Sequence, residues 1–325
     1  MNTATKLSVY GAALAVVAGC AWAVGSAVGP IEETGNGGNA AAGTGGTGHG
    51  DTHGGAVAET GQAAEALPAG LASSRGGYTF APVSTTVDPG PGTFSFRVTG
   101  PDGKPVTRFD VEHEKRMHLI VVRRDTAGFQ HVHPEMSADG TWSVPLTLGR
   151  PGSYRAFADF APTGGEATTL GVDLAVPGDF RPAAYTPSRV AHVDGYEVRL
   201  DGDVSPGRTA ELTLTVSKDG RPVTDLQPYL GAYGHLVALR GGDLAYLHVH
   251  PDGEPGDGKT APGPTVTFFA EVPSAGAYRL FLDFRHGDVV RTAEFTLVTA
   301  GHALPQAPPA AEDGTGHADT GHGHN

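Results

Sequence analysis

An internal duplication constrains the fold of this chain more than any other feature. The stretch from Met117 to Pro134 returns as Gly234 to Pro251, and in each copy a histidine is followed 13 and 15 positions later by the two histidines of an HVHP tetrapeptide. Flanking segments repeat in the same order: PDGKPVT matches KDGRPVT, and GSYRAFADF matches GAYRLFLDF. The chain therefore contains two copies of one domain. The matched histidines are His118, His131 and His133 in the first copy and His235, His248 and His250 in the second.

Composition narrows the class of protein and its partners. The 325 residues include 49 glycines and 25 prolines but few aromatic residues, which favours short strands and many turns. A formal charge of −13 and the lack of a basic face make nucleic acid an unexpected partner. The single cysteine, Cys20, lies in the apolar N-terminal segment, so we expect neither a disulfide nor a thiolate metal site in either copy. Each copy must therefore rest on its own apolar core, which about 100 residues can supply.

The region between the low-complexity ends has the pattern of an all-β protein. Short runs rich in Val, Thr, Phe and Tyr alternate with turn signals such as PGPG, PDGK and RPG. Seven or eight such strands in each copy predict two tandem immunoglobulin-like β-sandwiches. We expect the first over residues 77–180 and the second over residues 189–299, with a linker at 181–188 that its two prolines stiffen.

The N-terminal segment, residues 1–30, is expected to anchor the protein. Lys6 precedes an apolar run from Leu7 to Val28, which exceeds the about 20 residues that a membrane-spanning helix needs. The basic residue before the run and the acidic residues after it predict a single-pass protein of the cell membrane with extracytoplasmic domains. The alternative is a lipoprotein signal, because VAGC resembles a lipobox and would leave a lipidated Cys20. Both alternatives give the same topology.

Two segments lack the apolar residues that folding requires. Residues 31–76 are mostly Gly, Ala, Thr and acidic residues, and residues 300–325 end in GTGHADTGHGHN, so we expect a disordered tether and a disordered tail. Imidazoles on a flexible chain can collect a divalent ion, although the same composition also fits a plain spacer. The histidines of these segments are His49, His53, His302, His317, His322 and His324.

The repeated histidines predict a metal site in each copy. If the motif folds as a hairpin, His118 lies opposite His133, with His131 two residues along on the same face. The same register in the second copy pairs His235 with His250. Three imidazoles at one end of a hairpin suit a transition metal, with a copper ion as the first expectation and zinc as the second. The alternative is a set of structural histidines at a strand end that proline terminates.

The first copy offers donors that the second lacks. His113 precedes the triad and is expected to add to the first site, whereas its counterpart is Leu230. Met117 and Met136 also flank the triad, and a thioether donor would favour Cu(I). Both methionines fit equally well as packing at the edge of the core.

Part of the sequence resembles a known family. The string EHEKRMHLIVVRRDTAGFQHVHPE, followed by DGTWSVPLTL and GSYRAFADFAPTGGEATTLG, is similar to exported or membrane-anchored actinobacterial proteins with tandem YtkA-like and CopC-like domains. The resemblance covers roughly residues 77–299 and is most specific over 113–134. It implies immunoglobulin-type β-sandwiches and a link with heavy-metal handling outside the cytoplasm. The CopC ligand pattern, an N-terminal histidine with a short Asp/His motif, has no clear counterpart here.

No enzymatic activity is expected. Residues Gly242 to Glu254 match the spacing of the first cupin motif, but the histidine of the second cupin motif is missing. No nucleophile elbow, phosphate loop or CxxC occurs in the sequence. We therefore expect a membrane-tethered, extracytoplasmic copper-binding protein with a three-histidine site in each domain. The alternative is an adhesion or scaffold protein of the cell envelope that recognises a protein partner.

Overall fold

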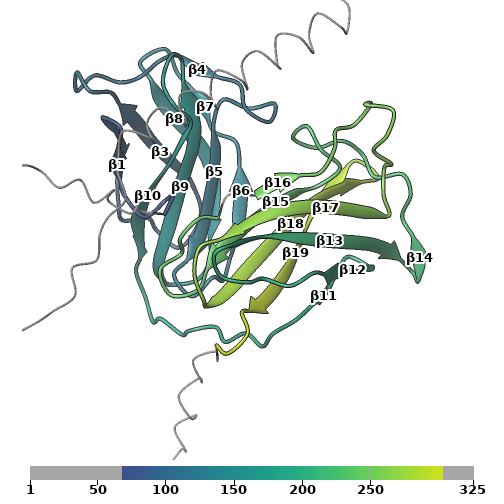
Figure 1. Ribbon diagram of the computed structural model, residues 1–325. Helices are drawn as coiled ribbons and strands as arrows, with labels where there is room; N and C mark the ends of the chain where they lie inside the picture. Colours follow the sequence, from purple (N-terminus) through teal and green to yellow (C-terminus); the bar gives the residue numbers. More distant parts are fainter. Residues whose placement is uncertain (1–67, 248, 303–325) are drawn as a thin grey trace, which may run out of the picture. The chain divides into compact units, whose positions relative to one another are not determined.

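The computed structural model describes residues 68–247 and 249–302, and this part of the chain is built from β-strands. The strands form two sandwiches in tandem, coloured blue to teal and green to yellow in Figure 1. The expected all-β fold with two immunoglobulin-like domains is confirmed. Within the described ranges no helix is long and apolar enough to span a bilayer. The expected anchor at residues 1–30 lies outside these ranges, as do most of the expected tether and tail.

The first sandwich consists of two antiparallel sheets with the orders β1-β2-β3-β8-β7 and β10-β9-β5-β6, and β4 pairs with β9. The immunoglobulin fold places strands A, B and E in one sheet and strands C, F and G in the other. Here β2, β3 and β8 correspond to A, B and E, and β5, β9 and β10 correspond to C, F and G. The strands are β1 (Ser74–Arg75), β2 (Tyr78–Pro82), β3 (Gly90–Thr99), β4 (Phe109–Asp110), β5 (His118–Arg123), β6 (Gln130–Val132), β7 (Glu135–Met136), β8 (Thr141–Leu148), β9 (Gly152–Pro162) and β10 (Thr168–Val176).

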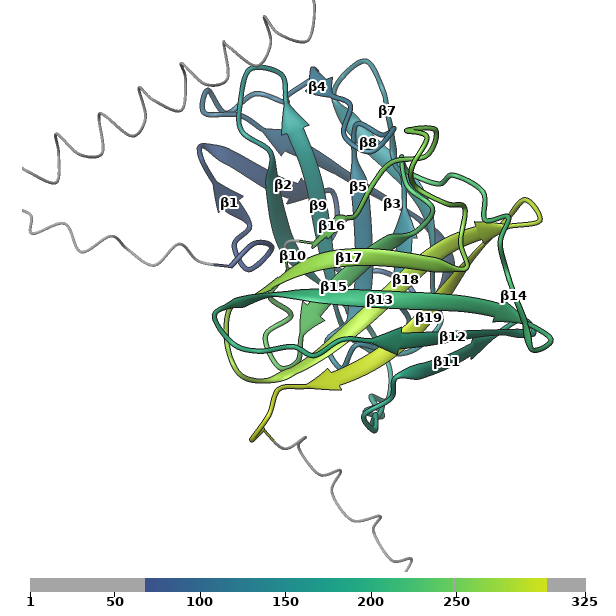
Figure 2. The same cartoon turned by 45° about the vertical axis from the view of Figure 1, so that its right-hand side comes forward.

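The second sandwich repeats this arrangement. One sheet has the order β11-β12-β13-β17-β16 with β14 paired to β13, and the other has the order β15-β18-β19. Figure 2 shows β13 between β12 and β17. The strands are β11 (Val190–Val193), β12 (Tyr196–Asp201), β13 (Arg208–Lys218), β14 (Arg221–Pro222), β15 (His235–Arg240), β16 (Val249–Pro251), β17 (Thr265–Val272), β18 (Ala277–His286) and β19 (Val289–Val298).

A buried tyrosine marks the equivalent corner of each sandwich. The Tyr154 hydroxyl, near the start of β9, donates a hydrogen bond to the Arg150 carbonyl at 2.8 Å. The Tyr278 hydroxyl, near the start of β18, donates to the Ser274 carbonyl at 2.6 Å. A tyrosine that bonds back to the preceding loop at the start of strand F is a feature of immunoglobulin-like domains.

The described residues form three apolar cores, one inside each sandwich and one between them. Alternate residues of β5 serve two cores: Leu119 packs inside the first sandwich, whereas Ile120 packs in the core between the sandwiches. In β15, Leu236 lies inside the second sandwich and Val237 in the shared core. All six residues of β5 are therefore buried. A strand that is covered on both faces has a continuous apolar run and no alternation, as in HLIVVR and HLVALR.

The shared core places equivalent positions of the two copies against each other. Phe129 stacks on Phe281 with ring centroids 4.0 Å apart, and the equivalent pair, Tyr246 and Phe157, has centroids 5.7 Å apart. An interface in which each surface meets its own copy has approximate two-fold symmetry. Each fully buried apolar side chain contributes about 1.5–3 kcal/mol relative to exposure. The fully buried members are Ile120, Val122, Phe157, Val237, Leu239, Leu244 and Phe281.

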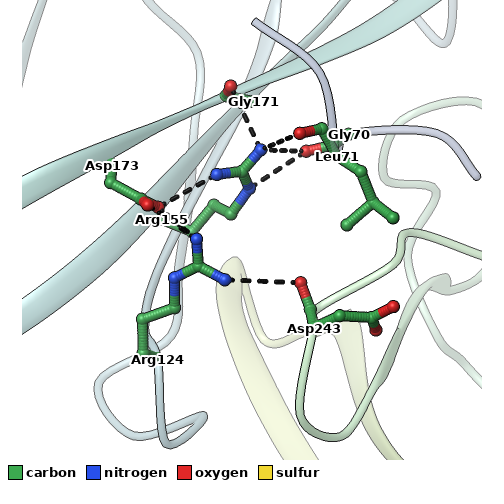
Figure 3. A network of polar contacts seen from close by, with 7 residues as sticks. All are labelled: Gly70, Leu71, Arg124, Arg155, Gly171, Asp173 and Asp243. Atoms are coloured by element: carbon green, nitrogen blue, oxygen red, sulfur yellow. Dashed lines mark hydrogen bonds and ion pairs between the residues drawn. The ribbon is translucent and has the colours of Figure 1, made fainter.

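A buried arginine network extends the ordered chain beyond the expected domain boundary. Figure 3 shows the guanidinium of Arg155, whose side chain is 7% exposed, enclosed by oxygen acceptors. Arg124 contacts the same carboxylate and donates to the carbonyl of Asp243 in the second sandwich at 3.5 Å. The partners of Arg155 are the carbonyls of Gly70, Leu71 and Gly171 and the carboxylate of Asp173. The expectation that the tether extends to residue 76 is therefore wrong at its end, because a buried guanidinium needs acceptors that residues 70 and 71 supply.

The linker is also held to both sandwiches. The Ala183 amide donates to Asp125 at 2.7 Å, and Arg123 donates to the Arg181 carbonyl at 3.1 Å. On the other side, the Arg279 guanidinium lies 3.8 Å from the centroid of the Tyr185 ring. Backbone and ring contacts of this kind restrict the linker more than its prolines alone would.

Candidate metal centre

The first HVHP hairpin positions three imidazoles as expected. β5 pairs with β6 so that Ile120 faces His131 and Leu119 faces Val132, and this register places His118 opposite His133. The turn is closed by the Arg123 amide, which donates to the Ala127 carbonyl at 2.9 Å. The expected register of this hairpin is confirmed.

These three histidines form a compact cluster. His118, His131 and His133 each offer a ring nitrogen within 4.8 Å of the others. His118 is 4% exposed, and the His131 side chain is 1% exposed. Nitrogens bound to one tetrahedral ion by bonds of about 2.0–2.1 Å lie about 3.3 Å apart, so a small rotation of the rings would complete a three-nitrogen site.

The second hairpin departs from the expected register. Leu239 and Tyr246 still form a bridge at the expected pairing, but the chain then crosses to the other sheet, where Val249–Pro251 pairs with β17. His250 faces Phe269 and is exposed, so the expected pairing of His235 with His250 is wrong. The crossing gives backbone groups at the edge of β17 a pairing strand. It also lets Val249 pack against the core of the second sandwich. His248 lies outside the described residues.

His235 joins the first triad. Its ring lies 5.8 Å from the His118 ring at an angle of 3°, and 4.9 Å from the His131 ring. The expectation of one separate site in each copy therefore needs correction. The two-fold packing of the sandwiches brings the start of β15 next to the start of β5, so the described motif histidines, apart from the exposed His250, gather in one cluster that both copies supply.

Hydrogen bonds fix the outer nitrogens of two rings. Nε2 of His118 lies 3.0 Å from the Glu112 carbonyl, and a carbonyl only accepts, so this nitrogen carries the hydrogen. Nδ1 of His131 lies 2.8 Å from a carboxylate oxygen of Asp283 and donates to it. The other oxygen of Asp283 accepts from the Thr292 hydroxyl at 2.6 Å. Carboxylates that orient histidines in this way are typical second-sphere groups of metal sites.

The inner nitrogens of the same two rings face each other. Nδ1 of His118 and Nε2 of His131 lie 3.2 Å apart. The third ring contributes a buried Nε2 of His133 that has no hydrogen-bond partner. Buried polar atoms usually have a partner, so this nitrogen is available to accept one.

Burial favours the neutral form of three of the imidazoles. It lowers the pKa of His118 to about 4, although the hydrogen bond to Glu112 opposes the shift. Burial and the neighbouring His131 and His118 lower the pKa of His133 to about 3. Burial likewise holds the pKa of His235 well below its ordinary value. Neutral imidazole is the form that binds metal ions, so the cluster is ready to coordinate at neutral pH.

His113 lies at the edge of the cluster and is exposed. Its ring centroid is 5.7 Å from that of His235 and 6.1 Å from that of His118. The two methionines do not approach as donors: Met117 is 1% exposed inside the first core, and Met136 packs against that core. The interpretation of both methionines as core packing is therefore the one that the structure supports.

Sequence reasoning missed Asp283, which orients His131 from the opposite copy. The signal was present, because both GSYRAFADF and GAYRLFLDF place an aspartate within an otherwise apolar strand. It also missed Tyr229, whose ring centroid lies 6.4 Å from that of His133. Burial, with the charge of Asp283, raises the pKa of Tyr229 to about 12, so the phenol stays neutral beside the cluster.

The chain is similar to several solved structures at low sequence identity and low TM-score. Salmonella alpha-2-macroglobulin is 14% identical with a TM-score of 0.24, over 72% of this chain and 15% of that chain. Invasin, a bacterial integrin-binding protein, is 12% identical with a TM-score of 0.22, over 68% and 40%. A putative membrane anchored protein from Corynebacterium diphtheriae is 13% identical with a TM-score of 0.21, over 72% and 61%. The chain thus spans less than two thirds of each of these proteins.

Sequence comparison identifies the family. No curated protein sequence matches the chain significantly. A family model described as a domain of unknown function, DUF8832, matches twice, over residues 73–178 and 191–301, in agreement with the two sandwiches. These matches cover more than half of the chain, which therefore belongs to the DUF8832 family, with two copies of its domain.

Proposed function

We propose that this chain is an extracytoplasmic, membrane-tethered protein that binds one transition-metal ion between its two sandwiches. His118, His131 and His133 are the primary ligands, and His235 of the second copy completes the shell. Asp283 orients His131. The expected N-terminal anchor supplies the tether, and the His-rich segments add weak binding outside the centre.

One observation carries the proposal: three clustered imidazoles bring ring nitrogens close together, and the hydrogens that His118 and His131 donate point away from the space between them. The hydrogen on Nε2 of His118 points to Glu112, and the hydrogen on Nδ1 of His131 points to Asp283; where each ring carries one hydrogen, two lone pairs meet at 3.2 Å. A cation between them removes the repulsion. A metal ion also gives the buried Nε2 of His133 a partner. A single proton shared between His118 and His131 would leave that nitrogen without one.

The ligand chemistry favours Cu(II) first and Zn(II) second. All candidate ligands are imidazole nitrogens, which suit both ions, and copper binds more tightly than zinc at a given nitrogen site. The thioether of Met117 lies inside the core of the first sandwich, so it is not a candidate ligand for Cu(I).

The rival is a scaffold protein in which the histidines are structural. A protonated His131 would bridge Asp283 and His118 without any metal, and within the cluster only Nε2 of His133 would then lack a partner among the described residues. In that case the immunoglobulin-like domains would serve recognition of an envelope partner.

The test is a calorimetric titration of the full chain with Cu(II) and Zn(II). The six histidines of the tether and tail are replaced in every sample so that they do not contribute. We expect one equivalent to bind, and replacement of His118, His131 and His133 by alanine to abolish this binding. The control replaces His192 and His286, which lie outside the cluster, and leaves binding unchanged. Equal binding by the triple variant and its parent would contradict the proposal.

A further inference from the structure

A groove of about 790 Å³ leads from the surface to the histidine cluster. The buried His118 forms part of its wall, together with two exposed histidines from different copies, His113 and His250. Three acidic residues, Glu112, Asp159 and Glu166, and one basic residue, Arg75, also line it. The groove thus connects solvent with an inner ligand of the proposed centre through a passage lined with imidazole and carboxylate groups.

The backbone at His113 is unusual for its sequence. His113 and Glu114 both have positive φ, at 46° and 65°, in a tight turn that the Glu112 and Lys115 backbones close with hydrogen bonds. Two consecutive positive φ values normally select Asn-Gly or a similar pair. The equivalent turn in the second copy uses Leu230 and Gly231, so glycine relieves its second position there. The positive φ at this position is shared with Leu230 and belongs to the turn, but only in the first copy does the turn carry a histidine that lines the groove.

His250 reaches the same groove because of the strand crossing that removes it from β15. Residues Val249–Pro251 run along the edge of β17, which leaves His250 exposed and on the wall of the groove. The departure from the register of the first copy therefore converts an expected inner ligand into a residue of the entrance.

We propose that the metal ion enters and leaves the centre through this groove, and that His113 and His250 bind it transiently on the way. This inference rests on the proposed metal centre. A ligand that holds the ion only in transit lowers the barrier in both directions, so it speeds loading and release by the same factor and leaves the dissociation constant unchanged. The acidic residues of the groove outnumber its one arginine, so they raise the local concentration of cations there.

The test uses the full chain with its tail histidines replaced. This protein is mixed rapidly with Cu(II) or Zn(II) and a metallochromic chelator, and the rates of metal loading and release are measured. The variants are His113→Asn, because asparagine tolerates left-handed backbone, and His250→Ala. The control is His192→Ala, an exposed histidine on β11. We expect the double variant to load and release the ion about tenfold more slowly, with an unchanged dissociation constant. Melting curves establish that each variant is folded.

Two results would overturn the inference while leaving the proposed centre intact. Unchanged rates in the double variant would show that neither histidine handles the ion in transit. A larger dissociation constant, with faster release and an unchanged loading rate, would show that His113 or His250 is a permanent ligand. If the parent chain binds no metal, the proposed function itself fails, and the inference falls with it.

Discussion

Asp283 offers the sharpest single perturbation of the proposed centre. Its carboxylate, 3% exposed, accepts from Nδ1 of His131 at 2.8 Å and from the Thr292 hydroxyl at 2.6 Å. In Asp283→Asn the side chain keeps its size and one oxygen acceptor but presents an amide that can donate to Nδ1. His131 would then carry its hydrogen on Nε2, the nitrogen that faces the cluster, and this hydrogen blocks coordination.

The expected loss in metal affinity is 10- to 100-fold, the usual effect of removing a second-sphere carboxylate. This corresponds to about 1.4–2.8 kcal/mol of binding free energy. Without metal, a charge-assisted hydrogen bond of about 1.5–3 kcal/mol becomes a neutral one of about 0.5–1.5 kcal/mol, so the free energy of unfolding should fall by about 1–2 kcal/mol.

Affinity is measured by competition with a chelator of known strength, and stability by urea denaturation. The matched control is Asp225→Asn, because Asp225 contacts Nε2 of His286 at 3.1 Å in a histidine–aspartate pair outside the cluster. It should leave metal affinity unchanged. If Asp283→Asn binds metal as tightly as the parent, or if the control loses as much affinity, the assignment of Asp283 as the residue that orients His131 is refuted.

Three further predictions follow from the packing and the electrostatics. Burial lowers the pKa of His118 from 6.5 to about 4, so between these pH values the unfolded chain binds more protons than the folded chain. The free energy of unfolding of the metal-free protein should therefore fall as the pH falls from 6.5 to 4. This group alone should account for roughly 3 kcal/mol of the loss. A flat urea midpoint over that range would contradict the burial of a neutral imidazole. Phe281→Ala should lower the free energy of unfolding by about 3–5 kcal/mol. It should also weaken metal binding, because the shared core holds Asp283 against His131. Denaturation measures the first effect and titration the second, and unchanged metal affinity would show that the centre does not depend on the shared core. Met117→Leu should leave metal affinity unchanged and alter stability by less than about 1.5 kcal/mol, and a loss of affinity in the same titration would make its sulfur a ligand.

The fold and half of the site follow from local patterns. The alternation of buried residues in β13, with Ala210, Leu212, Leu214 and Val216 facing inward, is the ordinary pattern of a sandwich strand. The register of the first hairpin follows from the length of its turn and the apolar face of β5, which is why the pairing of His118 with His133 could be predicted.

The position of the second set of histidines could not be predicted in this way. The path of the chain after Tyr246 depends on whether the next residues are more stable when paired with β15 or with the edge of β17. The tetrapeptide HVHP is the same in both copies, so it does not distinguish the two paths. The sharing of one centre depends on the packing of two domains, which local periodicity does not describe. The continuous apolar runs of β5 and β15 were the available sign that both faces of these strands are covered.

The most direct test of the central claim is X-ray absorption spectroscopy of the copper-loaded full chain, together with its metal content. The histidines of the tether and tail are replaced so that all signal comes from the sandwiches. We expect one copper per chain, bound by three or four imidazole nitrogens at about 2.0 Å with no sulfur neighbour. Two coppers per chain, a sulfur ligand, or a shell dominated by carboxylate oxygen would contradict a single histidine centre between the two domains.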